Sequence, residues 1–122
     1  MVELCLCFMG FVMLTVGVME FSMAIYAYNF CSYAARDGAR WASVHGSQSA
    51  SPATPDSVRS YVRAQAIALT SSNVLVTTTW TPDNTPGAVV KVVVAYTVTP
   101  LAYLALKQNL SVSSTSQVTI AH

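Results

Sequence analysis

The sequence has 122 residues, a length that suits one domain, and 53% of them are hydrophobic while only 9% are charged. Six Lys and Arg residues nearly balance five Asp and Glu residues, which leaves a net charge of +1 and no basic surface for nucleic acid. The composition excludes a nucleic-acid-binding protein and an ordinary soluble globule, and it favours apolar partners.

The N-terminal third holds most of the apolar residues. Residues 4–45 contain no proline, and between Leu4 and Ala35 the only charged residue is Glu20. We therefore expect one continuous helix of about 42 residues, roughly 63 Å long at 1.5 Å per residue. Because this is about twice the hydrocarbon thickness of a bilayer, half of the helix must stand outside the membrane.

The division of the chain follows from this helix. We expect residues 1–45 to form the helix, with 1–25 in a membrane or filament core and 26–45 packed on a head. Residues 46–122 then form a small globular α+β head. A head of this size buries little apolar surface by itself, so the outer half of the helix is expected to cover its sheet.

Small residues recur along the helix every seven positions, in phase with Glu3. They are Gly10, Gly17, Ala24, Cys31 and Gly38. Such a repeat keeps one stripe towards a partner helix, and small side chains let two backbones approach closely in lipid. The alternative is that Ala24 to Gly38 pack under the chain's own domain. Larger side chains, Tyr26, Phe30 and Tyr33, occupy another side of the helix.

All three cysteines lie in the apolar stretch. Cys5 and Cys31 are 26 residues apart, roughly 39 Å along one helix, which no disulfide within the chain can bridge. Cys5 and Cys7 point to different sides of the helix. We expect all three to be small buried thiols, with a disulfide between subunits as the alternative.

A polar loop over residues 46–55 ends the long helix. Asp56 is then expected to cap a second, amphipathic helix from about Ser57 to Ser71. After this helix the apolar period changes from that of a helix to two residues, which is typical of strands.

The rest of the chain predicts a hairpin, a short helix and a third strand. Residues 73–80 and 88–98 read as two strands joined by a turn over 81–87 with two prolines and a glycine. Thr99 and Pro100 begin a short helix over residues 100–107, and 110–120 alternate as a half-exposed strand. The expected fold class is α+β: a long N-terminal apolar helix and a head of one helix, a short helix and a three-stranded antiparallel sheet.

No enzyme motif is present. His45 and His122 have no second ligand at metal-binding spacing, and the sequence contains no Cys-x-x-Cys, phosphate loop or Gly-x-Ser-x-Gly. We therefore expect no enzymatic activity, no metal and no cofactor.

The few charged residues of the long helix are the remaining candidates for a functional role. A carboxylate at membrane depth costs about 2.5–3.5 kcal/mol, so Glu20 is expected to find a partner. Arg36 and Arg40 are the nearest cations, and Glu20 is 16 residues from Arg36, roughly 24 Å along the helix. A neighbouring helix offset by that amount would pair them. The alternative is that each charge reaches water on its own. Glu3 either lies at the bilayer surface or meets an N-terminal amine of a neighbour.

The residues at this point resemble a family. The segments "VEL", "MEF" and "IYAYNF", and above all "AARDGARWASV" at Ala34 to Val44, resemble the TadE-like minor pilins of the tight-adherence system. The strands, "YTVTPL" and "LSVSSTSQVTI" extend the resemblance over nearly the whole chain. It implies a pilin-like fold and a subunit of a type IV pilus-like filament.

The resemblance also implies partners and a location. The subunit would be inserted in the bacterial inner membrane, trimmed by a prepilin peptidase, and built by a membrane assembly platform into an extracellular filament of its own copies or related pilins. Glu3 would then help docking by pairing with an N-terminal amine. Family precursors carry a short basic leader, so we expect this chain to be trimmed already or its start to be assigned late. Read alone, Arg36 and Arg40 favour a cytoplasmic C-terminus, contrary to the family.

Two functions are carried forward. The first is a structural filament subunit whose assembly surface includes Glu3, Gly10, Gly17, Glu20, Ala24, Cys31, Arg36 and Arg40. The second is a membrane-anchored adhesion or binding module that does not polymerise. Replacing the helix by an unrelated anchor would abolish the first function and preserve the second.

Overall fold

A computed structural model describes residues 1–67, 69–99 and 109–121. The elements are α1 (Val2–Val44), α2 (Pro55–Ala64), a 3-10 turn η1 (Ser71–Asn73), β1 (Val74–Thr81), β2 (Val89–Val98) and β3 (Leu110–Thr119). The predicted α+β class, with its long N-terminal helix, shorter helix and three-stranded antiparallel sheet, is confirmed. The short helix predicted over residues 100–107 lies outside the described residues, as does His122.

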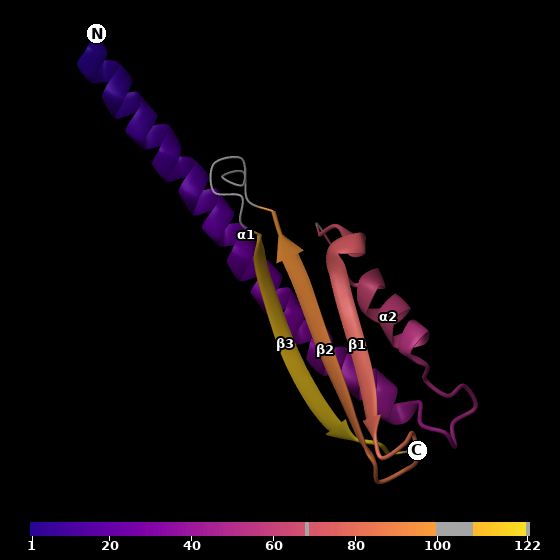
Figure 1. The fold of residues 1–122 in the computed structure, drawn as a ribbon. Helices are drawn as coiled ribbons and strands as arrows, with labels where there is room; N and C mark the ends of the chain where they lie inside the picture. The colour runs from indigo at the N-terminus through magenta and orange to yellow at the C-terminus, as the bar shows by residue number, and fades with distance from the viewer. Residues whose placement is uncertain (68, 100–108, 122) are drawn as a thin grey trace.

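The sheet covers only the C-terminal half of α1, and the N-terminal half projects away from it (Figure 1). The first residue of α1 that is buried is Ala27, and burial recurs on one side of the helix up to Ser43. The two chain ends lie at opposite ends of the molecule (Figure 1). One unbroken helix thus joins an uncovered apolar segment to a folded head.

Small side chains on α1 allow the sheet to pack closely on it. The fully buried residues on this side of the helix are Ala27, Cys31, Ala34, Ala35, Ala39 and Ala42. They face the inner side of β2 and β3, the strands with which α1 makes most of its contacts. The small-residue side of the helix therefore packs under the chain's own sheet from Ala27 onwards.

The sheet has the order β1-β2-β3, and each neighbouring pair is antiparallel. Side chains of the central strand alternate between the two faces, so Val90, Val92 and Val94 are fully buried against α1 while Lys91 is exposed. Beta-branched valines suit this pleated, half-buried position. As predicted, β3 is half-exposed, with Val112 and Val118 on the inner face.

The start of α2 differs from the prediction. Thr54 is the N-cap, and its hydroxyl and that of Ser57 form a reciprocal capping box, with Pro55 in the first turn. Asp56 is instead in the first turn, where its carboxylate pairs with Arg59 at 3.2 Å. The prediction that Asp56 is the cap was wrong because a hydroxyl two residues earlier supplies the cap and proline begins the helix.

The end of α2 also differs, since the helix stops at Ala64 and not near Ser71. Three tertiary contacts hold the chain that leaves it. The guanidinium of Arg63 donates to the carbonyl of Val74, the Gln65 amide donates to Asp37, and the Tyr26 hydroxyl donates to the carbonyl of Ile67. The chain turns towards β1 at this point although the sequence pattern would let the helix continue.

The predicted hairpin is present, with β1 paired to β2 over residues 74–81 and 89–96. Gly87 precedes β2 with a φ of +90°, a conformation that favours glycine. Its N–H donates to the carbonyl of Ile120, which ties the turn to the end of β3.

Candidate functional site

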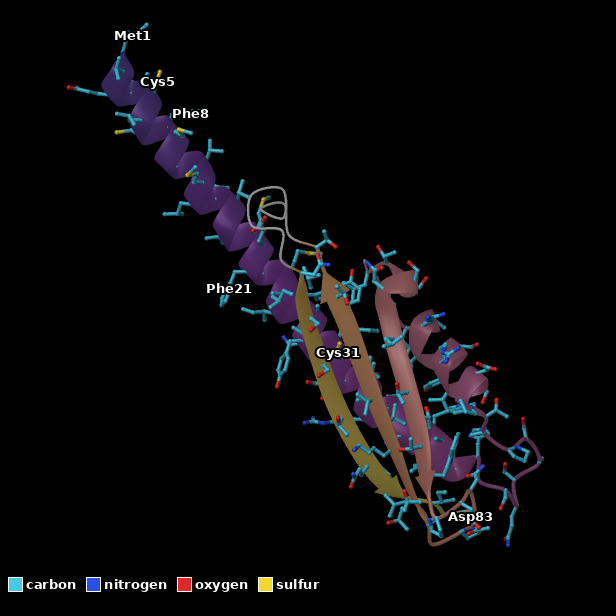
Figure 2. All side chains as sticks on the ribbon, in the orientation of Figure 1. Met1, Cys5, Phe8, Phe21, Cys31 and Asp83 are labelled. Atoms are coloured by element: carbon cyan, nitrogen blue, oxygen red, sulfur yellow. The ribbon has the colours of Figure 1, made fainter. Side chains whose placement is uncertain are left out.

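The N-terminal half of α1 is apolar on all sides, and the described residues of the chain leave most of it exposed. Large side chains such as Leu4, Phe8 and Phe21 are 74%, 68% and 68% exposed. Met1, Cys5, Phe8 and Phe21 lie on the part of the helix that projects beyond the sheet (Figure 2). α1 is long and apolar enough to cross a membrane, and its most apolar window is not buried in the molecule.

The predicted assembly residues nearest the N-terminus are Glu3, Gly10 and Gly17. Glu3 is exposed in the first turn of α1, where the positive end of the helix dipole favours an acid. Gly10 and Gly17 are exposed, and a methyl group added to either would meet no atom of the described residues within 4 Å. The fold itself therefore does not require glycine at these two positions.

Glu20 and Ala24 lie where the projecting segment meets the head. They line a groove of about 280 Å³ together with Gly17, the end of β2 at Val98 and the start of β3 at Leu110. Glu20 is half-buried and takes part in an interaction within its own chain. Its carboxylate thus lies on the same side of α1 as the sheet, just beyond the sheet's edge.

The motif Ala34 to Val44 joins α1 to α2 through Asp37. One carboxylate oxygen, Oδ2, accepts a hydrogen bond from the Tyr61 hydroxyl at 2.8 Å and one from the Gln65 amide at 2.6 Å. The bonds from Gln65 and Tyr61, with the charge of Arg40, lower the pKa of Asp37. The bond between Tyr61 and Asp37 also raises the pKa of Tyr61. The carboxylate is a structural clamp between the two helices.

The same motif uses glycine for a close approach. A methyl group on Gly38 would lie 3.0 Å from a Val62 methyl, 3.6 Å from one of Val92 and 4.0 Å from one of Val58. Two turns of α2 and the central strand therefore meet α1 at this position. Unlike Gly10 and Gly17, Gly38 is required by the chain's own packing.

Trp41 completes this contact between the helices. Its ring stacks on Tyr61 with centroids 5.1 Å apart and on His45 with centroids 4.2 Å apart. His45 Nδ1 also bonds the Trp41 carbonyl at 2.8 Å. His45 thus ends the long helix by packing, as expected for a residue at the start of a loop.

Arg36 and Arg40 are the charged residues of the motif that the fold leaves exposed. They lie one turn apart on the side of α1 that faces away from the sheet, and with Tyr33 and Asp37 they line a shallow hollow of about 240 Å³. In the described part of the chain, Arg59 and Asp56 form an ion pair, and neither Arg36 nor Arg40 takes part in it.

The structure separates the predicted assembly residues other than the buried Cys31 into three groups. Glu20, Gly17 and Ala24 share one groove, and Arg36 and Arg40 share the opposite side of α1, about 24 Å further along. Glu3 and Gly10 lie nearer the N-terminus. Glu20 and the two arginines are therefore not brought together within one copy.

The cysteines have two environments. Cys31 is fully buried beneath the sheet, with its thiol 3.8 Å from the Val112 carbonyl, as predicted for a small buried residue and as expected if this part of the stripe packs on its own domain. Cys5 and Cys7 are exposed on the projecting segment. Their predicted burial was wrong for the isolated chain, because nothing in the described structure covers this segment.

Asp37, Gly38, Trp41 and Tyr61 were missed as residues that hold the helices together. The motif pointed to residues 34–44, but only the position of α2 explains why a carboxylate, a glycine and a tryptophan follow one another there. In residues 1–67, 69–99 and 109–121, no three His, Cys, Asp or Glu side chains lie close enough to hold a metal ion.

Of three comparisons with known proteins, the one with protein-family models gave a match. Searches of the curated proteins and of the solved structures found no match. The resemblance of the strands therefore stays a prediction. Residues 1–40, which span the projecting segment and the first part of the motif, match the family model described as TadE-like protein, and the family resemblance is confirmed over this part of the chain.

Proposed function

We propose that the chain is a structural subunit of a type IV pilus-like filament of the tight-adherence kind, which polymerises through its apolar N-terminal helix. In this proposal the subunit is inserted in the bacterial inner membrane before assembly and becomes part of an extracellular filament afterwards. Its partners are copies of itself or related pilins, a prepilin peptidase and a membrane assembly platform. These partners are supported by the family match alone.

The observation that carries the proposal is the exposed apolar surface of residues 2–24. This segment is about 35 Å long, close to the hydrocarbon thickness of a bilayer. Leaving a Leu or Phe side chain in water costs about 1.5–3 kcal/mol relative to burial, and such side chains lie on every side of the segment. The segment therefore needs either lipid or several neighbouring helices around it.

In a polymerising subunit the apolar segment is covered both before and after assembly. Lipid surrounds the segment before assembly, and helices of other subunits replace the lipid in a filament core. The head, which has a compact core of its own, then stays outside. Glu3 fits this scheme as the acid that the family resemblance assigns to docking.

The competing function is a membrane-anchored adhesion or binding module that does not polymerise. In that case the helix is only an anchor, and any apolar helix of similar length would replace it. The exposed glycines Gly10 and Gly17 favour polymerisation, because an anchor surrounded by lipid has no need of close helix contacts.

Exchange of the anchor distinguishes the two functions. Residues 2–24 are replaced by an unrelated apolar helix of the same length, and sheared fibres are separated from detergent-solubilised membranes. We expect the wild-type chain in the fibre fraction and the exchanged chain in the membrane fraction alone. Recovery of the wild-type chain only from membranes, with adhesion retained after the exchange, would support the anchored module.

Glu3→Ala tests the docking role within this proposal. We expect normal membrane insertion and a reduced yield of fibres. Asp83→Ala is a matched control, since Asp83 is an exposed carboxylate at the far end of the head (Figure 2). Normal fibres from Glu3→Ala would contradict the docking role.

A further inference from the structure

Two faces of α1 stay exposed, and they lie at different heights on the helix. The first continues the side that carries the sheet: Cys31 is buried there, and the same seven-residue phase leads down to Ala24, Gly17 and Gly10. This face is flat. The second is the opposite side of the head part of α1, where Tyr33 is 64% exposed.

The second face has the same period as the first and carries large side chains. Tyr26, Tyr33 and Arg40 follow one another at intervals of seven residues. Tyr26 is 42% exposed even though its hydroxyl bonds the Ile67 carbonyl, so its ring remains available. A flat stripe and a bulky stripe with the same repeat therefore lie on opposite sides of one helix.

One axial shift brings the two stripes into register. When a parallel copy of α1 is displaced by 16 residues, about 24 Å, each small residue of one copy faces a large residue of the other. The pairs are Gly10 with Tyr26, Gly17 with Tyr33, and Ala24 with Arg40.

The same shift brings opposite charges together. Glu20 faces Arg36, since their positions also differ by 16. Glu20 already takes part in an interaction within its own chain, but a carboxylate has about four acceptor sites and can bind a guanidinium as well. The shift therefore meets the two requirements of a helix contact in a low-dielectric core, close packing and charge compensation.

The displaced copy's helix ends at Val44, which lies opposite Tyr28, one residue beyond the first buried position Ala27. Its last turns therefore lie against the groove formed by Gly17, Glu20 and Ala24 with the edge of the sheet. The displaced helix therefore ends within one turn of the point where the sheet begins to cover α1.

We propose that the flat face of α1 in one copy binds the bulky face of α1 in a second copy, parallel and displaced by 16 residues, with Glu20 paired to Arg36. This contact rests on the proposed function, because it supposes that copies of the chain associate. It sets the axial spacing between two neighbouring subunits at about 24 Å.

A pair of engineered cysteines tests the register in the full chain. In a Cys5→Ser, Cys7→Ser background, Gly17→Cys with Tyr33→Cys is expected to give a ladder of disulfide-linked multimers under mild oxidation. Gly17→Cys with Asn29→Cys is the control: Asn29 is also exposed, but its displacement of 12 residues leaves the two sulfurs about 6 Å out of register along the helix. The ladder is scored in whole cells and in sheared fibres.

Charge reversal tests the ion pair. Glu20→Arg and Arg36→Glu are each expected to reduce fibre yield several-fold, and the double variant to restore it. Arg59→Glu, which reverses a half-exposed arginine of α2 on the surface of the head, should leave the yield unchanged.

The outcomes separate this contact from the proposed function. A ladder from the 17/33 pair alone, with rescue by the double variant, supports the contact. Wild-type fibres combined with no 17/33 ladder, or with a 17/29 ladder instead, overturn the register while the filament function stands. If the wild type forms no fibres, the filament function fails. The ladder in whole cells then still decides whether the helices pair in the membrane.

Discussion

Gly38→Ala is the sharpest test of how α1 and α2 fit together. Alanine is about 1 kcal/mol better than glycine inside a helix, so the exchange would stabilise α1 if space were available. The added methyl group would lie 3.0 Å from a methyl of Val62, whose β-branched side chain is fully buried. Overpacking of this kind costs about 1–3 kcal/mol, so the net effect is expected to be a destabilisation of about 0–2 kcal/mol.

A double-mutant cycle isolates the steric cost. Val62→Ala removes the methyl group in question, so in that background Gly38→Ala is expected to stabilise the head by up to about 1 kcal/mol. The free energy of unfolding is measured by urea denaturation of the full chain in detergent micelles, with the fluorescence of Trp41 and Trp80 as the signal. Gly10→Ala is the control, because no atom lies within 4 Å of the added methyl group.

The sign of the effect decides the matter. If Gly38→Ala stabilises the head equally in the wild-type and Val62→Ala backgrounds, glycine is not needed for the approach of α2. The close contact would then not explain this residue of the motif.

Three further predictions concern the clamp, the cap and the stripe. Because the pKa of Asp37 is lowered in the folded chain, this carboxylate stabilises the fold above pH about 4, and the stabilisation is lost as the pH falls through the folded pKa. The free energy of unfolding of Asp37→Asn should therefore depend less on acid pH than that of the wild type, and the same holds for Tyr61→Phe. Thr54→Ala should cost about 1 kcal/mol of unfolding free energy by loss of the cap, whereas Asp56→Ala should cost less than about 0.5 kcal/mol, and the reverse order would show that Asp56 acts as the cap. Gly17→Leu should leave insertion and head unfolding unchanged but lower fibre yield, and normal fibres would contradict a close helix contact at this position.

Local patterns predicted the elements of the fold well. A continuous run over residues 4–45 with no proline and only three glycines predicted one long helix, because proline would interrupt its backbone hydrogen bonds. Alternating valines likewise predicted β2 and its hairpin with β1. The boundaries of α2 were predicted less well, since its end at Ala64 depends on contacts with α1 and β1 that no local pattern records.

The candidate assembly surface was likewise only partly predictable from the sequence. The seven-residue stripe was visible in the sequence, but periodicity cannot tell which partner covers a helix face. In the described fold Cys31 and Gly38 are buried whereas Gly10 and Gly17 are exposed, so one stripe has two environments along its length.

Length, apolar composition and the seven-residue period belong to the sequence, because each depends only on which residues follow one another along a helix. They determined that this chain has a long apolar helix with a flat side. The tertiary structure alone decided where the sheet ends on that side, why Asp37 and Gly38 stand in the motif, and that Arg36 and Arg40 face away from the sheet. These features depend on contacts between residues far apart in the sequence, and such contacts exist only once α2 and the sheet have packed on α1.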